Sequence, residues 1–408
     1  MKFHAVILSI ILGALVAGQS SAQWVQTTLP GFNGTSHALL VSGTNLFAGT
    51  DSGGVFLSTN NGTSWTAVNT GIGLADRYVW AMIATSYNVL VGTSGATYVS
   101  TNNGANWTST SGSGGVSALA MSVSNLVSTN VFAGAGGGVY LSTNNGVLWK
   151  LAKTGLTTTD VRALAISDTN IFAGTLGGGV FLSTNNGSKW TAVGTSQIDG
   201  SVRALLFSGQ NLFAGTGNGV YVSSDKGSTW TSVSTGLETV GYVDALEAYT
   251  TNLYAGTWSG QVFLSTNNGK NWTSIGTNLA ANGPVHALAI SNGFLFAGTN
   301  NGVWRLPLSV NSIDPGWVHS PETFRLTQNF PNPFNPSTQI VFSVTKEGPV
   351  TLRVFDILGR EVATLVDGNR KAGEYSERFV GSRLASGVYL YVLQSAEGRL
   401  TSRMILSK

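Results

Sequence analysis

The sequence of 408 residues has no cysteine, and only 10% of its residues are charged. Without thiols the chain can form neither disulfides nor thiolate metal sites. Little charge together with 42% hydrophobic residues excludes a disordered chain, because disorder requires low hydrophobicity and high net charge. The 53 glycines follow no three-residue period, which excludes a collagen-like helix.

Basic residues are also scarce in the large middle of the chain. Residues 23–321 contain 9 Lys and Arg against 10 Asp and Glu, a net charge of −1. Residues 322–408 contain 11 against 8, a net of +3, and Lys2 supplies the remaining positive charge. A middle part without a basic field does not attract phosphates, so we expect no nucleic-acid partner.

Long hydrophobic runs are absent after the first 22 residues. Met1-Lys2 precedes an apolar stretch from Ala5 to Ala17, and a segment rich in small residues ends at Ala22. This pattern predicts a secretory signal peptide (1–22) that is cleaved after Ala22. The stretch is shorter than the roughly 18–20 apolar residues of a membrane anchor. We therefore expect export to the periplasm or beyond, with no transmembrane span after cleavage.

The sequence contains a repeat of about 41 residues. The run S-T-N-N-G-x-x-W, or a close variant, ends at Trp65, Trp107, Trp149, Trp190, Trp230 and Trp272, with spacings of 42, 42, 41, 40 and 42 residues. A second motif, close to A-G-T after an apolar pair, occurs seven times. Each unit shows four short runs rich in Val, Ile, Phe and Thr, separated by Gly and Asn, which predicts four strands per unit. That is the size of a propeller blade.

Counting the strands predicts how such a ring closes. The first three strand types occur seven times, whereas the last unit, 286–308, lacks the tryptophan strand. Trp24 lies 41 residues before Trp65, so residues 24–28 can supply the missing strand. We expect an all-β, seven-bladed propeller over residues 23–308, closed by pairing of residues 24–28 beside residues 302–308.

The tryptophan motif resembles the Asp-box, or bacterial neuraminidase repeat, of sialidases, sortilin-type receptors, xyloglucanases and photosystem assembly-factor-like propellers. Ser223 to Trp230 carries the full form with Asp225, and the other five copies carry Asn in its place. The resemblance implies a structural turn, so we expect Asp225 and the six tryptophans to hold the blades together. It specifies the fold and leaves the function open.

The composition changes at residues 309–321, which predicts a linker to a second domain. Residues 322–408 contain about seven short alternating runs, which predicts a small immunoglobulin-like β-sandwich. Four motifs carry a resemblance to the C-terminal sorting domain of the Bacteroidota type IX (Por) secretion system: Q-N-F-P-N-P-F-N-P-S-T at 328–338, V-F-D-I-L-G-R-E-V at 354–362, L-A-S-G-V-Y at 384–389 and the terminal residues 403–408. The resemblance implies that residues 322–408 engage the type IX machinery and its surface sortase, and that the protein reaches the extracellular space or the outer cell surface.

One variable residue precedes an alanine in the first strand of each unit, which is the strand expected to line the channel. A ligand site could be built from these seven residues; the alternative is that their side chains are only solvated at the mouth of the channel. The residues are His37, Trp80, Ser117, Arg162, Arg203, Asp244 and His286. Within the set, His37, Asp244 and His286 could hold a metal. Arg162 and Arg203 could bind a carboxylate or sulfate. No cofactor is expected.

Three functions stay open. The first is a non-catalytic propeller that binds a glycan or a protein, with Trp80 and Trp258 available for stacking on sugars. The second is a glycoside hydrolase that uses channel-mouth acids, namely Asp244 with Glu247 or Asp51. Glu247 stands where other repeats carry a small residue such as Ala165 or Ala289, and a carboxylate there requires a partner. It therefore either pairs with a ring arginine or points to a site. The third function is a structural component of the cell surface.

Overall fold

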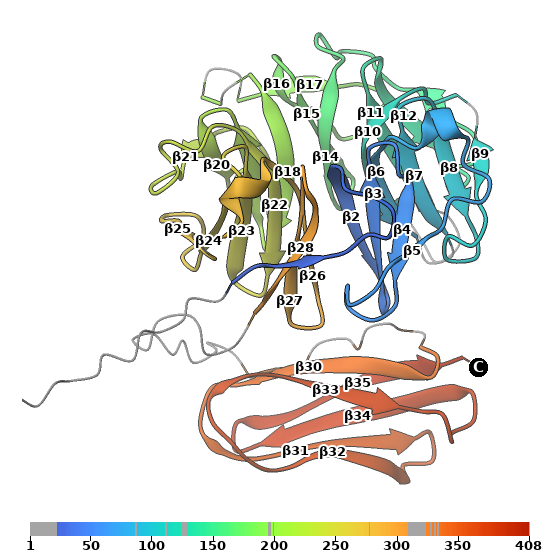
Figure 1. Ribbon diagram of the computed structural model, residues 1–408. Helices are drawn as coiled ribbons and strands as arrows, with labels where there is room; N and C mark the ends of the chain where they lie inside the picture. The colour runs from blue at the N-terminus through green and yellow to red at the C-terminus, as the bar shows by residue number, and fades with distance from the viewer. Residues whose placement is uncertain are drawn as a thin grey trace, which may run out of the picture. The chain divides into compact units, whose positions relative to one another are not determined.

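The computed structural model describes residues 23–407 except 86–87, 111, 124–128, 195–196, 199, 277, 309–323, 327–328, 330–331 and 333. The expected signal peptide (1–22) and linker (309–321) therefore lie outside the described residues. The chain divides into two compact units, one up to Ser312 and the other from Ile313. Both units are all-β (Figure 1), and the short 3-10 helices η1 (Leu74–Asp76) and η2 (Ala280–Asn282) are the exceptions among the described residues.

The first unit is built from seven four-stranded antiparallel sheets, as far as the chain is described. Six are formed by consecutive strands, β2–β5, β6–β9, β10–β13, β14–β17, β18–β21 and β22–β25, and the seventh has the order β1-β28-β27-β26. The strands are β1 (Val25–Thr27), β2 (Ser36–Ser42), β3 (Asn45–Thr50), β4 (Val55–Ser58), β5 (Thr66–Ala67), β6 (Val79–Ala84), β7 (Val89–Thr93), β8 (Thr97–Ser100), β9 (Thr108–Thr110), β10 (Val116–Val123), β11 (Thr129–Ala135), β12 (Gly138–Ser142), β13 (Lys150–Leu151), β14 (Val161–Ser167), β15 (Asn170–Thr175), β16 (Gly179–Ser183), β17 (Thr191–Val193), β18 (Val202–Ser208), β19 (Asn211–Thr216), β20 (Gly219–Ser223), β21 (Thr231–Ser232), β22 (Val243–Tyr249), β23 (Asn252–Thr257), β24 (Val262–Ser265), β25 (Thr273–Ser274), β26 (Val285–Ser291), β27 (Phe294–Thr299) and β28 (Gly302–Pro307).

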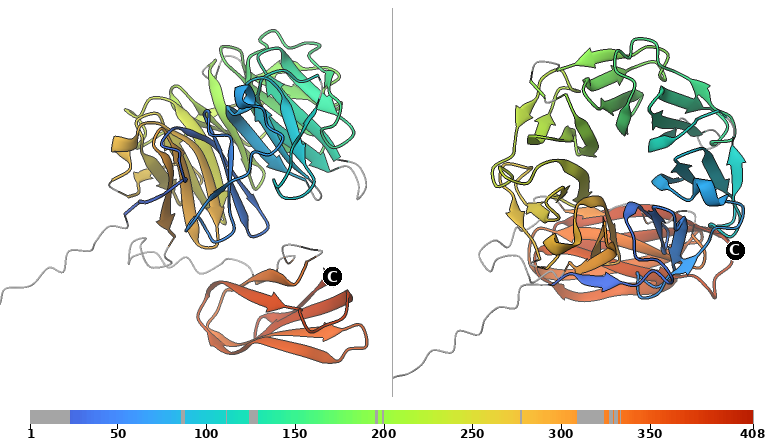
Figure 2. Two further views of the ribbon diagram at one scale, coloured as in Figure 1. Left: turned by 45° about the vertical axis from the view of Figure 1, so that its right-hand side comes forward. Right: turned by 45° about the horizontal axis from the view of Figure 1, so that its top comes forward.

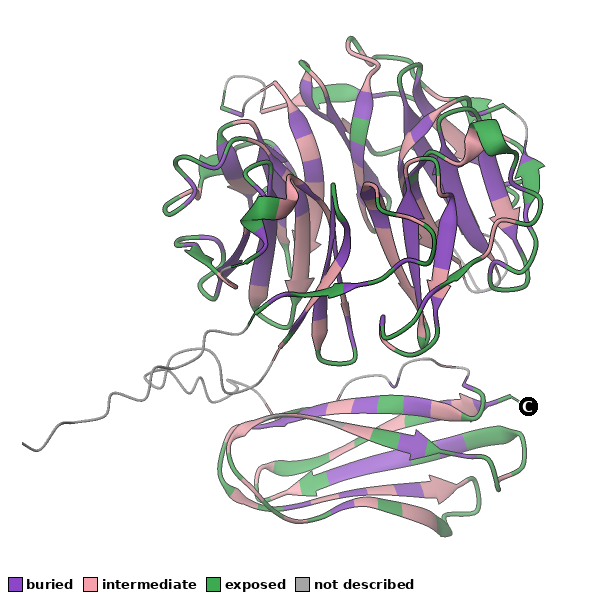
Figure 3. Ribbon diagram, viewed as in Figure 1, coloured by how far each residue is buried: buried purple, intermediate pink, exposed green. Residues whose placement is uncertain are grey.

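The seven sheets of this unit stand around a common centre, as the right-hand view of Figure 2 shows. Neighbouring sheets touch through their first strands. Strand β2 contacts both β6 and β26, and β10, β14, β18 and β22 follow in chain order between them. Many residues of these strands and of the strands behind them are buried (Figure 3), and their apolar members form cores shared by adjacent sheets. The first strands therefore surround the middle of the unit and carry its innermost side chains.

Strand β1 joins the start of the described chain to the last sheet. It pairs antiparallel with β28, with Val25 opposite Arg305 and Thr27 opposite Val303. Trp24, just before β1, is buried, and its indole Nε1 donates a hydrogen bond to the carbonyl of Ile275 at 3.1 Å. Thr27 Oγ1 in turn accepts a hydrogen bond from Trp65 Nε1 of the first sheet at 3.1 Å. Strand β1 thus contacts both the last and the first sheet.

The six tryptophan motifs form one type of turn. In the first, Ser58 Oγ accepts a hydrogen bond from the Gly62 amide at 2.9 Å, and Asn60 Oδ1 accepts one from the Ser64 amide at 2.9 Å. Asn61 has φ +56°, in the left-handed region that asparagine tolerates. The same two bonds recur in the other five turns. The motif therefore encodes a turn whose backbone donors are satisfied by its own side chains.

The tryptophans that end these turns pack against the preceding sheet. Five are buried and Trp149 is half-buried. Five indole Nε1 groups donate hydrogen bonds to an outer strand, or the residue after it, of the neighbouring sheet, as Trp107 does to the Val68 carbonyl at 2.7 Å. Trp230 differs, because its indole nitrogen is buried without a hydrogen-bond partner among the described residues.

The second unit holds two sheets, β29-β30-β33 and β32-β31-β34-β35, around a shared core. Ile340 and Phe342 of β30 and Val354 of β31 are among the fully buried members of that core. Burial alternates along the strands, so one face of each sheet is apolar (Figure 3). The strands are β29 (Arg325–Leu326), β30 (Ser337–Val344), β31 (Gly348–Asp356), β32 (Glu361–Arg370), β33 (Gly373–Val380), β34 (Gly387–Ser395) and β35 (Gly398–Leu406).

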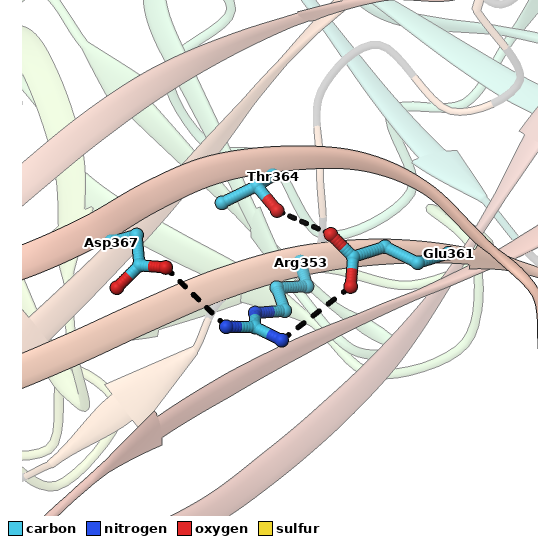
Figure 4. Close-up of polar contacts among 4 residues, drawn as sticks. All are labelled: Arg353, Glu361, Thr364 and Asp367. Atoms are coloured by element: carbon cyan, nitrogen blue, oxygen red, sulfur yellow. Dashed lines mark hydrogen bonds and ion pairs between the residues drawn. The ribbon is translucent and has the colours of Figure 1, made fainter.

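Ion pairs cross the solvent face of the larger sheet. Arg353 of β31 lies 3.5 Å from Glu361 and 3.4 Å from Asp367, both on β32, and Glu361 also accepts a hydrogen bond from Thr364 (Figure 4). These side chains are substantially exposed, and exposed pairs contribute little to stability. The cluster therefore links β31 with β32 without adding much stability, and it keeps the Arg353 guanidinium paired.

Candidate functional site

A β-bulge in the first strand of every sheet of the repeat unit positions the candidate site. In β2 the register shifts between Ser36 and Ala38, so His37 is the extra residue, and the same shift occurs in the other six first strands. The extra residues are the seven variable positions of the sequence, His37, Trp80, Ser117, Arg162, Arg203, Asp244 and His286. A bulge leaves its extra residue out of the ladder and re-aims the side chain.

Aromatic rings from adjacent sheets form a continuous series in this region. The ring centroids of Trp80 and His37 lie 4.2 Å apart, and those of His37 and His286 lie 5.0 Å apart. His286 meets the edge of Trp258 at 6.5 Å, and Trp258 meets Tyr242 at 6.0 Å. We call these five residues the aromatic arc. Trp80 is 39% and Trp258 47% exposed, so both indoles are open to a ligand.

An ion pair anchors one end of the aromatic arc. The Arg203 guanidinium lies 4.2 Å from the centroid of the Tyr242 ring and 5.3 Å from that of Trp258. Its Nη1 is 3.6 Å from Oδ1 of Asp244, whose Oδ2 is 3.7 Å from Nδ1 of His286. Arg203 Nε and Asp244 Oδ1 are buried without a hydrogen-bond partner among the described residues. Arg203 and Asp244, beside the arc, can therefore still form hydrogen bonds through these two atoms.

The histidines at the centre of the aromatic arc are linked electrostatically. Burial, and secondarily the neighbouring His286, lowers the pKa of His37 to about 4, so His37 is neutral at pH 7. His286 Nε2 is 2.7 Å from Oδ1 of Asn300, which fixes the orientation of its ring. Because Arg203 and Asp244 offset each other, the arc presents aromatic surface with little net charge.

Four of the seven predicted residues are not among the five residues of the aromatic arc. Arg203 and Asp244 lie beside the arc, whereas Arg162 and Ser117 belong to the fourth and third sheets. Arg162 pairs with Asp160, with its Nε 2.8 Å from Oδ1, and Ser117 lies on β10. Each of the two guanidinium groups faces a carboxylate of the chain, so a carboxylate or sulfate ligand of Arg162 and Arg203 would compete with Asp160 and Asp244.

The proposed metal ligands do not form a metal site. No group of three His, Asp or Glu side chains is placed to hold an ion within the described ranges. His37 contacts the ring of His286, while Asp244 faces Arg203 and His286. Stacking and ion pairing thus occupy the side chains that the sequence suggested as ligands.

The candidate acids have separate surroundings. Asp51 Oδ1 accepts a hydrogen bond from the Thr35 amide at 3.1 Å, and Glu247 Oε1 accepts one from the Ala248 amide at 3.1 Å. Burial raises the pKa of Glu247 to about 7. No cation among the described residues forms an ion pair with Glu247, so it does not pair with a ring arginine.

Sequence reasoning missed Tyr242 and Asn300. Asn300 follows the A-G-T motif, at the position that Trp258 occupies one repeat earlier. Tyr242 comes two residues before the bulge residue Asp244, at another variable position. A comparison of the repeats at these two positions, like the one at the bulge position, points to both residues.

The comparisons identify the second unit and the fold of the first. Residues 328–407 match the family model of the secretion system C-terminal sorting domain. This tail implies that the protein is exported through the type IX secretion system, with which it interacts, to the cell surface or the medium. No helix of the described residues is long and apolar enough to cross a membrane. No curated protein matches the chain.

Solved structures share the propeller-like fold at low sequence identity. YCF48 bound to D1 peptide has a TM-score of 0.57 at 13% identity, over 73% of this chain and 98% of that one. The GH74 xyloglucanase from Xanthomonas campestris has a TM-score of 0.58 at 14% identity, over 72% and 54%. The extracellular domain of BT3049 from B. thetaiotaomicron has a TM-score of 0.59 at 15% identity, over 95% and 58%. These likenesses concern the fold alone.

Proposed function

We propose that the first unit is a seven-bladed β-propeller closed by β1, and that it binds a glycan on the aromatic arc without catalysis. The pairing of β1 with β28 and the bond from Trp65 to Thr27 support the ring. We further propose that the tryptophan turns are Asp-boxes, and that the exported second unit is an immunoglobulin-like sandwich that the surface sortase cuts away within residues 309–321.

The aromatic arc is the observation that carries the ligand proposal. Successive ring centroids 4.2–6.5 Å apart run from the second sheet through the first and the seventh to the sixth. Sugars offer apolar C–H faces that stack on exposed indoles, and their hydroxyls require hydrogen bonds. Trp80 and Trp258 supply exposed indoles, while Asp244 and Asn300 supply polar groups beside them.

The charge of the aromatic arc favours a neutral glycan. A sialidase-type site needs several free arginines around a substrate carboxylate. Here Arg162 faces Asp160 and Arg203 faces Asp244, while Arg305 Nη1 donates to the Asn61 carbonyl at 2.8 Å. An acidic sugar on the arc would meet the carboxylate of Asp244 and a neutral His37.

A glycoside hydrolase is the second candidate, because Glu247 is a buried carboxyl whose pKa of about 7 suits a general acid. Asp244, its proposed partner, is engaged by Arg203 and His286. A protein ligand is a third possibility, since a propeller-like neighbour is described with a bound peptide.

A glycan array tests the proposal with the wild type and with Trp80→Ala and Trp258→Ala. We expect binding of neutral oligosaccharides that falls by about tenfold or more in each variant, since a buried aromatic contact is worth well over 1 kcal/mol. Tyr249→Ala is the matched control, because Tyr249 is exposed at the opposite end of β22. Release of shorter sugars would favour the hydrolase. Absence of any glycan binding would reject the ligand proposal and leave a protein ligand or a structural role.

A further inference from the structure

The turn between β31 and β32 exposes two large aliphatic side chains. Ile357 is 74% and Leu358 72% exposed, the highest fractions among the large hydrophobic residues described in the second unit. Turns normally carry Gly, Asn, Asp or Ser at such positions. Two adjacent aliphatic side chains in water are therefore an unusual feature of this unit.

Two other connections between strands of the same unit show the contrast. The β30–β31 connection carries Lys346 and Glu347, and the β34–β35 connection carries Glu397. Glu397 also accepts hydrogen bonds from the Thr345 amide, so this tip is tied down by polar contacts. Polar residues thus serve as tips elsewhere in the unit, and the aliphatic pair is specific to one turn.

Asp356 holds this turn in one conformation. Its Oδ1 accepts hydrogen bonds from the amides of Leu358 at 2.9 Å and Arg360 at 3.0 Å. Its Oδ2 lies 2.7 Å from Nε of Arg360, and Gly359 donates back to the Asp356 carbonyl at 3.0 Å. Gly359 has φ +78°, which a residue with a side chain would adopt only with strain. The hydrogen bonds, led by the one from the Arg360 amide, hold the pKa of Asp356 below its usual value.

The rigid turn favours binding through its two exposed aliphatic side chains. A fixed turn loses little conformational entropy on binding, so little of the free energy gained by burying its two aliphatic side chains is offset. Arg360 is neutralised by Asp356, so the turn carries no unpaired charge at its tip. Its chemistry fits an apolar recess on a protein, where burial of two aliphatic side chains stabilises the complex.

We propose that Ile357 and Leu358 are the anchor through which the second unit docks into an apolar recess of a protein of the type IX export machinery. We choose this partner because the turn lies within residues 328–407, which match the sorting domain of the secretion system. The proposal does not depend on glycan binding, since it concerns a different unit of the chain.

Export of the full chain from a bacterium with a type IX system tests this proposal. The test variant is Ile357→Ser with Leu358→Ser, and the matched control is Val380→Ser with Val388→Ser, two exposed aliphatic residues on strands of the same unit. A swap that keeps the turn apolar, Ile357→Leu with Leu358→Ile, is the rescue. Immunoblots of medium and cell fractions measure the exported share, and thermal melts of purified chains measure folding.

We expect unchanged melting of all variants, with export lost only in the test variant I357S/L358S. Each buried aliphatic side chain is worth about tenfold in affinity, so the exported share should fall by about tenfold or more. Wild-type export of I357S/L358S would overturn the proposal, as would an equal loss in the control or no rescue by the swap. Binding of the purified chain to lipid vesicles, or its dimerisation, would overturn the choice of partner if either required Ile357 and Leu358.

Discussion

Replacing Trp24 by alanine tests whether β1 closes the ring. Trp24 is only 2% exposed and packs in the core between the sixth and seventh sheets. The substitution removes the indole and its hydrogen bond to the Ile275 carbonyl. It keeps the two bonds that Asn278 makes with the backbone N–H and carbonyl of residue 24, so β1 can still dock.

The expected loss follows from the burial of the indole. Truncating a buried tryptophan to alanine costs about 3–5 kcal/mol. For a unit of this size each kcal/mol lowers the melting temperature by about 2–4 °C, which predicts a fall of about 6–20 °C. Deleting residues 23–30 removes the indole together with the β1–β28 ladder and should lower the melting temperature further.

Differential scanning calorimetry of the purified chain measures this fall. Val25→Ala is the matched control, because Val25 is adjacent, lies on the same strand and is 53% exposed. A surface substitution changes stability by no more than about 0.5 kcal/mol, so the control should melt within about 2 °C of the wild type. If Trp24→Ala melted like Val25→Ala, β1 would not be part of the folded ring and the closure would be refuted.

Three further predictions concern single side chains. Because the pKa of His37 is lowered to about 4, the folded wild type should lose stability as the pH falls from 6.5 to 4. In His37→Asn the melting temperature should therefore drop less over this pH range, and identical pH profiles of the two proteins would contradict the prediction. Glu247→Gln should raise the melting temperature at pH 8 and change it little at pH 4, because a pKa raised to about 7 costs stability only as the pH rises from 4.5 through 7; melts at both pH values decide. Asp225→Asn should leave the melting temperature unchanged, since Asn occupies this position in the other turns. Asp225→Ala should lower the melting temperature, because it removes the acceptor of the Thr229 amide; equal melting temperatures of the two variants would show that this acceptor is dispensable.

The sequence predicts the repeat well because its signals are local. Ser, Asn and Gly at fixed offsets before each tryptophan specify a turn that is satisfied by its own side chains, so no distant contact is needed to recognise it. The 41-residue spacing between Trp24 and Trp65 likewise pointed to the strand that pairs with β28. The ion pair of Arg162 with Asp160 was harder to predict, because Asp160 looks like an ordinary loop residue in the sequence.

The candidate site shows why the rest could not be predicted. The variable positions were found because the repeats align, but the bulge that re-aims them is a backbone feature without a residue type of its own. Which side chains meet depends on how the first sheet contacts the last, and His37 reaches His286 across that junction. The repeats mark the position of Tyr242 as variable, but its contacts with Arg203 and Trp258 follow only from the fold.

The proposed ring suggests how the proposed binding site arises within a nearly uniform repeat. Alanine follows every bulge residue, and a small side chain there keeps the first strands close together. The bulge residue is outside the ladder, so it can change without disturbing the sheet. Aromatic and polar residues gather on one side of the ring, from Trp80 through His37 and His286 to Asp244 and Arg203, whereas the remaining two positions carry Ser117 and a self-paired Arg162. Substituting Trp80 should therefore impair binding and leave the fold intact, whereas replacing Ala81 by a larger residue should lower the stability of the fold itself.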